Sequence, residues 1–238
     1  LISGEKRRLT NKGTWWDSDE FALYSKFSPD GKQIAYNWFN KDNLYDLRVI
    51  AVSAGAEAAK PRVVYRNEEI EYLQPGDWSR DGRLIATILT RKDRTSQLAM
   101  VSVADGSARV IKSLEWRYPN CVGLSPDGRY LAYDFPEREG APERDINVLA
   151  TDGSREAPLI QHPARDGCPI WTPDGKGILI GSDRTGTTAG WLIRVADGKP
   201  QGAPELVIKH DVGPGAMPMG LSPGGAFYYG FQASARDV

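Results

Sequence analysis

Gly220-Leu-Ser-Pro-Gly224 matches the pattern G-x-S-x-G, which holds the nucleophilic serine of many hydrolases. In those enzymes the serine lies on a turn from a strand into a helix, and an acidic residue and a histidine follow it in the chain. No histidine follows Ser222 here. Ser222 also belongs to the last of five copies of a repeated motif, which gives its position a structural explanation. We therefore expect Ser222 to be inert and the chain not to be an enzyme.

The only two histidines, His162 and His210, are 48 residues apart and are the starting point for any transition-metal site. A zinc or manganese ion there would need Asp166, Asp211 or other neighbours to complete its coordination. Because two histidines are few for such a site, we expect no transition metal and no organic cofactor.

Cys121 and Cys168 occupy equivalent places, each six residues before the aspartate of its own copy of the repeated motif. No C-x-x-C spacing is present, which argues against a metal or redox role. The simplest interpretation is two small buried side chains in inner strands. A disulfide between neighbouring repeats is the alternative, and two cysteines do not decide the redox compartment.

The repeated motif is an aromatic residue or leucine followed by Ser-Pro-Asp-Gly, and its fourth residue recurs at intervals of 46 to 51 positions. The five copies are Phe27-Ser-Pro-Asp-Gly31, Trp78-Ser-Arg-Asp-Gly82, Leu124-Ser-Pro-Asp-Gly128, Trp171-Thr-Pro-Asp-Gly175 and Leu221-Ser-Pro-Gly-Gly225. An apolar run follows each copy, beginning at Ile34, Ile85, Leu131, Ile178 and Tyr228. A second Asp-Gly pair then follows at Asp105, Asp152 and Asp197.

Asp-Gly between two apolar runs is a strong hairpin signal, because Gly reaches positive φ at little cost and Asp hydrogen-bonds its own backbone. Two such turns in each repeat would join four short strands. Four antiparallel strands repeated around five times are typical of an all-β propeller, in which each repeat is one blade. No window shows the sustained apolar period of a helix. The sequence thus predicts a β-propeller of four-stranded antiparallel blades, with four complete repeats from Phe21 to Ile208.

The repeated Ser-Pro-Asp-Gly with its Ile-Ala-Tyr run resembles the TolB-like propeller repeat, and it is similar to the propeller domains of tricorn and prolyl-oligopeptidase-type peptidases. Ser182-Asp-Arg-Thr-Gly186 resembles the same group, whereas Arg80 and Gly224 depart from the motif without preventing a turn. The resemblance implies one propeller domain over residues 1–238 that starts and ends inside a blade. We expect a piece cut from a longer chain, either a closed five-bladed ring or part of a ring of six or more blades.

In such a blade the loops between the second and third strands lie at the end opposite the Asp-Gly turns. We expect these loops at 38–44, 90–96, 136–145 and 182–188, where the chain is polar. Binding residues favour loops on a rigid scaffold. The candidate contacts for a protein or peptide partner are Trp38, Phe39, Arg91, Arg94, Arg138 and Arg184. A structural Ca²⁺ ion in the central channel, held by aspartate carboxylates and carbonyls, is the one cofactor alternative.

Composition limits the partners further. The chain carries 30 Lys and Arg against 31 Asp and Glu, and its net charge is −1. It contains no long basic run and no apolar stretch of the ~20 residues that a membrane span needs. We therefore expect no nucleic acid, no membrane insertion in this segment, and a monomer.

Three functions remain open. The resemblance to TolB implies a non-catalytic binding module with a periplasmic or other extracytoplasmic location. The resemblance to the peptidases implies instead a propeller that gates substrate for a catalytic domain outside this chain. A ligand-sensing propeller of a signalling protein is a third possibility, and a cytoplasmic location is the alternative compartment.

The repeat also predicts the core. The first residues of the motif should lie in innermost strands and face between blades: Phe27, Trp78, Leu124, Trp171 and Leu221. The first residues of the apolar runs, from Ile34 to Tyr228, should take the matching place in the second strands. Trp38, expected in a loop, should tolerate replacement.

Overall fold

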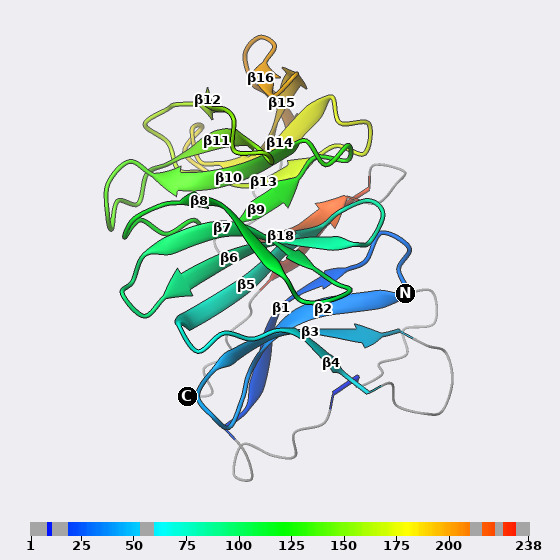
Figure 1. Ribbon diagram of the computed structural model, residues 1–238. Coiled ribbons are helices and arrows are strands. Elements are labelled where there is room, and N and C mark those ends of the chain that lie inside the picture. Colours follow the sequence, from blue (N-terminus) through cyan, green and yellow to red (C-terminus); the bar gives the residue numbers. More distant parts are fainter. Residues whose placement is uncertain (1–8, 11–18, 53–59, 210–215, 222–225, 232–238) are drawn as a thin grey trace, which may run out of the picture. The chain divides into compact units, whose positions relative to one another are not determined.

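The chain is all β in the parts that can be described. The structure, a computed structural model, describes residues 9–10, 19–52, 60–209, 216–221 and 226–231 (Figure 1). Every regular element in these ranges is a β-strand, and they contain no helix with the length and apolar content of a membrane span. The expectations for Ser222, His210 and Asp211 lie outside the described residues.

The strands form a series of antiparallel sheets in chain order (Figure 1). The first sheet contains β1 (Phe21–Phe27), β2 (Gln33–Phe39), β3 (Tyr45–Ala51) and β4 (Arg62–Tyr65). The second contains β5 (Ile70–Trp78), β6 (Leu84–Arg91), β7 (Ser96–Ser102) and β8 (Ala108–Ser113). The third contains β9 (Val122–Leu124), β10 (Tyr130–Pro136), β11 (Arg144–Ala150) and β12 (Glu156–Ile160).

The fourth sheet adds one short strand to this plan. It contains β13 (Asp166–Trp171), β14 (Gly177–Ser182), β15 (Ala189–Ala196) and β17 (Glu205–Ile208), and β16 (Lys199–Pro200) also pairs with β15. A hairpin of β18 (Ala216–Leu221) and β19 (Phe227–Phe231) follows. The four complete repeats predicted from Phe21 to Ile208 are therefore confirmed.

The Ser-Pro-Asp-Gly motif forms the same turn in all four complete sheets. In the second sheet the Ser79 hydroxyl donates to Asp81 Oδ1 over 2.6 Å and accepts from the Leu84 amide over 2.9 Å. The Arg83 amide donates to the same carboxylate, and Gly82 has a φ of +71°. Matching hydrogen bonds and glycines occur at Ser28, Ser125 and Thr172. The motif is thus a structural hairpin, as the sequence indicates.

The Ser79 hydroxyl, followed by the Arg83 amide, holds the pKa of Asp81 below its ordinary value. We expect Ser79→Ala to raise the pKa of Asp81, because the carboxylate loses the bond that favours its charged form. An NMR pH titration of the side-chain carboxyl would measure this, with Asp174 as internal control, since its partner Thr172 is untouched. An unchanged pKa of Asp81 in the variant, with Asp174 also unchanged, would contradict the prediction.

The chain divides into two compact units, 1–94 with 99–110 and 95–98 with 111–238. The core of the first unit joins the first two sheets and includes Leu47, Leu73, Trp78 and Ile85. The core of the second unit joins the third and fourth sheets and contains Ile146, Val148, Trp171, Ile178 and Ile193.

Most of the expected core residues are buried, but the two ends of the series differ. Trp78, Leu124 and Trp171 are at most 7% exposed, whereas Phe27 is 64% and Tyr228 is 52% exposed. Trp171 is covered because it stacks on Tyr130 of the preceding sheet, with the ring centroids 6.3 Å apart. Among the described residues no sheet precedes Phe27 in the chain and none follows Tyr228, so the expectation of burial is wrong at both positions.

Candidate functional site

Each sheet has two chemically different ends. The Asp-Gly turns lie at one end, called the turn end here. The connections between second and third strands lie at the other, the loop end. These connections are residues 40–44, 92–95, 137–143 and 183–188. They are shorter than the loops predicted from the sequence, because the strands extend further than expected. Both Trp38 and Phe39, for example, belong to β2.

The loop end of the first unit carries five aromatic rings from two sheets, which we name the aromatic cluster. Its members are Phe21 and Tyr24 of β1, Phe39 of β2, Tyr45 of β3 and Tyr72 of β5. Tyr24 is 43% exposed and the other four are half-buried. Only Phe39 was among the candidates from the sequence.

The rings of the aromatic cluster form a continuous chain of contacts. Phe21 stacks on Phe39 at a centroid distance of 5.0 Å, and Phe39 lies 5.1 Å from Tyr45. Tyr45 meets Tyr72 edge-on at 4.9 Å, and Tyr72 meets Tyr24 edge-on at 6.4 Å. Cross-strand pairing of Phe21 with Phe39 and of Phe39 with Tyr45 explains why three of them share one side of the sheet.

A β-bulge in β1 orients Tyr24, which has a φ of +45°. The fully buried Asn37 holds this bulge: its Oδ1 accepts from the Leu23 amide over 3.0 Å, and its Nδ2 donates to the Leu73 carbonyl over 2.7 Å. One side chain therefore fixes the backbone of two neighbouring inner strands. The aromatic cluster thus stands on backbone that Asn37 ties together.

Trp38 belongs to β2 and is only 6% exposed, so the expectation that it lies in an exposed loop is wrong. Its Nε1 donates to Glu20 over 3.0 Å, and the Arg48 guanidinium lies 4.9 Å from its ring. Arg48 and Arg66 both bind the fully buried Asp46, opposite Trp38 in the register. Burial alone would raise the pKa of Asp46, but the hydrogen bonds from the two arginines outweigh it and lower that pKa.

The arginines expected as contacts have different surroundings. Arg91 ends β6, is half-buried and lies 3.6 Å from Asp93. Arg94 is exposed in the next loop with a φ of +67°, and Arg138 is exposed in the 137–143 loop. Arg184 is largely withdrawn from solvent, because it donates to Asp166 over 2.7 Å and covers the Trp191 ring at 4.9 Å.

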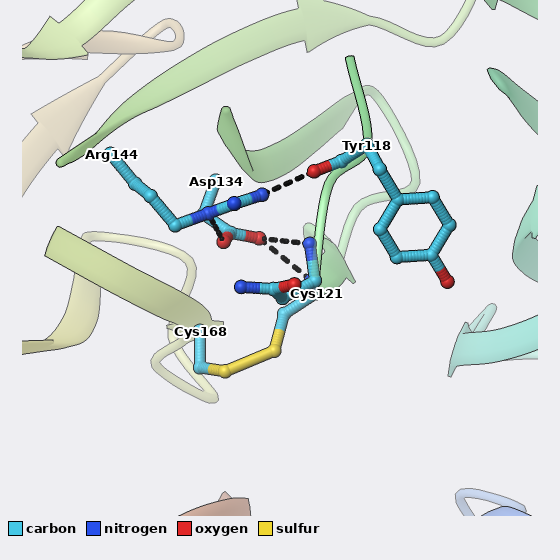
Figure 2. The surroundings of a disulfide bond; sticks show 6 residues. Tyr118, Cys121, Asp134, Arg144 and Cys168 are labelled. Carbon is cyan, nitrogen blue, oxygen red and sulfur yellow. Dashed lines mark hydrogen bonds and ion pairs between the residues drawn. A yellow bond between two sulfur atoms is a disulfide. The ribbon is translucent and has the colours of Figure 1, made fainter. Parts of the chain in front are cut away.

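In the second unit, Figure 2 shows a buried carboxylate beside the junction of two inner strands. Asp134 is fully buried and accepts from the amides of Asn120 and Cys121 over 3.0 and 2.7 Å. Arg144 donates to Asp134 and to the Tyr118 carbonyl (Figure 2). Burial raises the pKa of Asp134, although Arg144 opposes that effect.

Cys121 and Cys168 form a disulfide (Figure 2), so the preferred expectation of two buried thiols is wrong. Cys168 sits in a β-bulge of β13 with a φ of +49°, and Cys121 directly precedes β9. Both are half-buried. Each stands three residues before its motif, in the position that Tyr24 takes in β1, and their Cα atoms are 4.9 Å apart.

Sequence reasoning missed Trp116, which is 61% exposed between β8 and β9. The available signal was a lone tryptophan in a connection between sheets, outside the repeated motif. Among the described residues no three His, Cys, Asp or Glu side chains gather closely enough to hold a metal ion.

Comparisons with known proteins agree on the fold. No protein-family model matches the chain. A structure from Agrobacterium tumefaciens assigned as TolB is 25% identical with a TM-score of 0.69, over 91% of this chain and 72% of that one. TolB of Acinetobacter baumannii is 18% identical with a TM-score of 0.61, over 90% of this chain and 48% of that one.

Two peptidase-related proteins are also similar. Prolyl oligopeptidase B from Galerina marginata is 16% identical with a TM-score of 0.57, over 85% of this chain and 30% of that one. The uncharacterized peptidase YuxL of Bacillus subtilis (strain 168) is 38% identical over 56 residues, which are 24% of this chain and 8% of that protein. The chain has the all-β propeller fold that is found in TolB proteins and in prolyl oligopeptidases.

Proposed function

We propose that this chain is a non-catalytic propeller module that binds a peptide segment of a partner protein at the loop end of its sheets. The observation that carries the proposal is the aromatic cluster. Aromatic rings dominate binding energy at protein interfaces, since they combine a large apolar area with little side-chain entropy.

The aromatic cluster suits an extended peptide. Its rings offer faces for proline or apolar side chains, as in other aromatic-lined peptide grooves. The hydroxyls of Tyr24, Tyr45 and Tyr72 add polar groups that can bond peptide carbonyls. Burial, followed by the neighbouring Tyr24, raises the pKa of Tyr45. The support by Asn37 keeps the rings in place before binding, which lowers the entropic cost of association.

A random dodecapeptide library displayed on phage tests the proposal. We expect peptides selected on the wild-type chain to bind Tyr24→Asn and Tyr72→Ser at least tenfold more weakly, equivalent to about 1.4 kcal/mol each. Asn is chosen at position 24 because it tolerates the positive φ there. Tyr228→Ala, at an aromatic of the other unit that is 52% exposed against 43% for Tyr24, is the control. Selected peptides that bind both cluster variants normally would refute the proposal.

The absence of catalysis is part of the same proposal. We expect the purified chain to hydrolyse neither p-nitrophenyl acetate nor a peptide substrate, and Ser222→Ala to change nothing. Hydrolysis that disappears in this variant would contradict a non-catalytic role.

A second candidate is a gating propeller of a serine peptidase, and the match to the peptidase YuxL favours it. The whole gene product distinguishes the two candidates. An α/β-hydrolase segment in the same polypeptide would select the gating role, and its absence would select the binding module.

We also propose an extracytoplasmic location, supported by the Cys121–Cys168 disulfide, because structural disulfides persist in oxidising compartments. To measure the redox state of the two cysteines, the protein is isolated from the cells that naturally make it, denatured, and treated with an alkylating agent that labels free thiols. Protection of both sulfurs agrees with the proposal, and two labelled thiols would contradict it.

A further inference from the structure

Guanidinium groups cover aromatic rings repeatedly in this chain. The described contacts, with the guanidinium carbon 4.3 to 5.3 Å from the ring centroid, are those of Arg48 on Trp38, Arg117 on Phe135, Arg129 and Arg155 on Tyr130, and Arg184 on Trp191. The negative face of an aromatic ring attracts a cation, and arginine makes such contacts more often than lysine does. A stacked guanidinium is therefore a common neighbour for the aromatic rings of this protein.

The rings of the aromatic cluster have different neighbours. Among the described residues no Lys or Arg side chain covers Tyr24, Phe39 or Tyr45, and Tyr24 is 43% exposed. Tyr72 stands nearly perpendicular to both Tyr45 and Tyr24, at interplanar angles of 75° and 86°. Rings that meet at such angles form a corner, where a planar group can stack on one ring and point its edge at the next. We name Tyr24, Tyr45 and Tyr72 the tyrosine corner.

The hydroxyls of the tyrosine corner add hydrogen-bond acceptors. Tyr24 and Tyr45 interact electrostatically, and this interaction, after burial, raises the pKa of Tyr45. Each phenol oxygen accepts hydrogen bonds, and an arginine side chain supplies five N–H donors in one plane. A guanidinium in the corner would therefore stack and donate at the same time. A proline or an apolar side chain would fill the same corner but offer these oxygens no donor.

The backbone of Tyr24 gives an independent reason to expect a ligand at this corner. Its φ of +45° lies in a region that bulky residues rarely adopt. Strained backbone of this kind is concentrated at ligand-binding and other functional positions. The bulge that Asn37 holds thus presents an exposed ring in a conformation that packing alone does not favour.

We propose that the peptide segment bound at the aromatic cluster is anchored by one arginine, whose guanidinium stacks in the tyrosine corner and donates to a phenol oxygen there. Arginine suits the corner better than lysine, because a guanidinium is planar and weakly hydrated, whereas an ammonium group is a strongly hydrated point charge. The inference rests on the proposed function and names the chemistry of the partner segment that the aromatic cluster selects.

Peptides selected on the wild-type chain by phage display test the anchor directly. Each arginine of a selected peptide is replaced in turn by citrulline, which has nearly the same shape but no charge, and by lysine. We expect one citrulline replacement in each peptide to weaken binding about three- to thirtyfold in fluorescence anisotropy. Lysine at the same position should recover only part of the loss. Peptides that depend on the aromatic cluster yet contain no arginine, or that bind equally well with citrulline, would overturn the proposal.

Two variants of Tyr24 distinguish a contact between the cation and the ring from ordinary apolar packing. Tyr24→Phe keeps an aromatic ring and Tyr24→Leu does not, while neither relieves the positive φ, so their melting temperatures should agree. The arginine peptides should bind Tyr24→Phe within about threefold of wild type and Tyr24→Leu about three- to thirtyfold more weakly. Equal affinities for the two variants would overturn the contact with this ring.

A double-mutant cycle then locates the arginine. The citrulline peptide should lose little affinity on Tyr24→Leu, because the two replacements remove the same contact and their effects are coupled. If citrulline weakens binding to Tyr24→Leu as much as it weakens binding to wild type, the arginine lies elsewhere and the proposal fails.

The outcomes also separate this inference from the proposed function. Peptides that lose affinity for Tyr24→Asn and Tyr72→Ser but bind equally well with citrulline would leave the binding module in place and remove the arginine anchor. Peptides that bind both variants normally would remove the proposed function and the anchor with it. A selection that yields no binding peptide would contradict both.

Discussion

Replacing Trp78 with alanine is expected to lower the free energy of unfolding by about 3–5 kcal/mol. Trp78 is 5% exposed in the core of the first unit, and its Nε1 donates to the Lys26 carbonyl over 3.0 Å. Its loss therefore removes core volume and leaves a carbonyl of the neighbouring inner strand without its donor. Since a domain is typically stable by only ~5–15 kcal/mol, this variant should be close to unfolding.

Trp38→Ala and Trp116→Ala complete the comparison, with melting temperature by circular dichroism as the measurement. Trp38 is 6% exposed and packs in a second cluster with Tyr36 and Ile50, so its loss should also be severe. Trp116 is 61% exposed, and its replacement should stay within about 0.5 kcal/mol of wild type. If Trp116→Ala were the most damaging of the three, the division into core and surface would be wrong.

Removing the disulfide by Cys121→Ser with Cys168→Ser is expected to cost about 4 kcal/mol. The bond closes a loop with a sequence separation of 47 residues, and the chain-entropy relation for such a loop gives this magnitude. The bond also joins the inner strands of two consecutive sheets in the second unit, so its loss frees a packed junction.

Urea unfolding with and without dithiothreitol measures this effect. Reduced wild type should match the double variant, and dithiothreitol should leave the double variant unchanged. A difference below about 1 kcal/mol between oxidised and reduced wild type would contradict a stabilising role for the bond.

The fold could be predicted because its signal is local and repeated. Ser-Pro-Asp-Gly forms its turn through hydrogen bonds within six residues, such as those of Ser79, Asp81 and Leu84. Each hairpin can therefore be predicted from its own copy of the motif, independently of the rest of the chain. The apolar runs that begin at Ile85, Leu131 and Ile178 mark the second strands for the same reason.

The candidate site was predicted less well because its residues depend on contacts between sheets. Trp38 looks like a loop residue beside Asn40 and Lys41, but β2 continues past it and Arg48 covers its ring. Arg184 looks free in a polar loop, yet the distant Asp166 binds it. Tyr24 and Cys168 stand at the same distance from their motifs in the sequence, but only the structure shows that both lie in a β-bulge with positive φ.

The most direct test of the central claim is a hydrogen-exchange map of the chain bound to a phage-selected peptide. The account predicts new protection at the loop end of the first unit, in residues 39–45 and 70–73, with unchanged exchange in the Asp-Gly turns at 30–31 and 81–82. Protection confined to those turns, with the aromatic cluster unaffected, would contradict binding at the loop end.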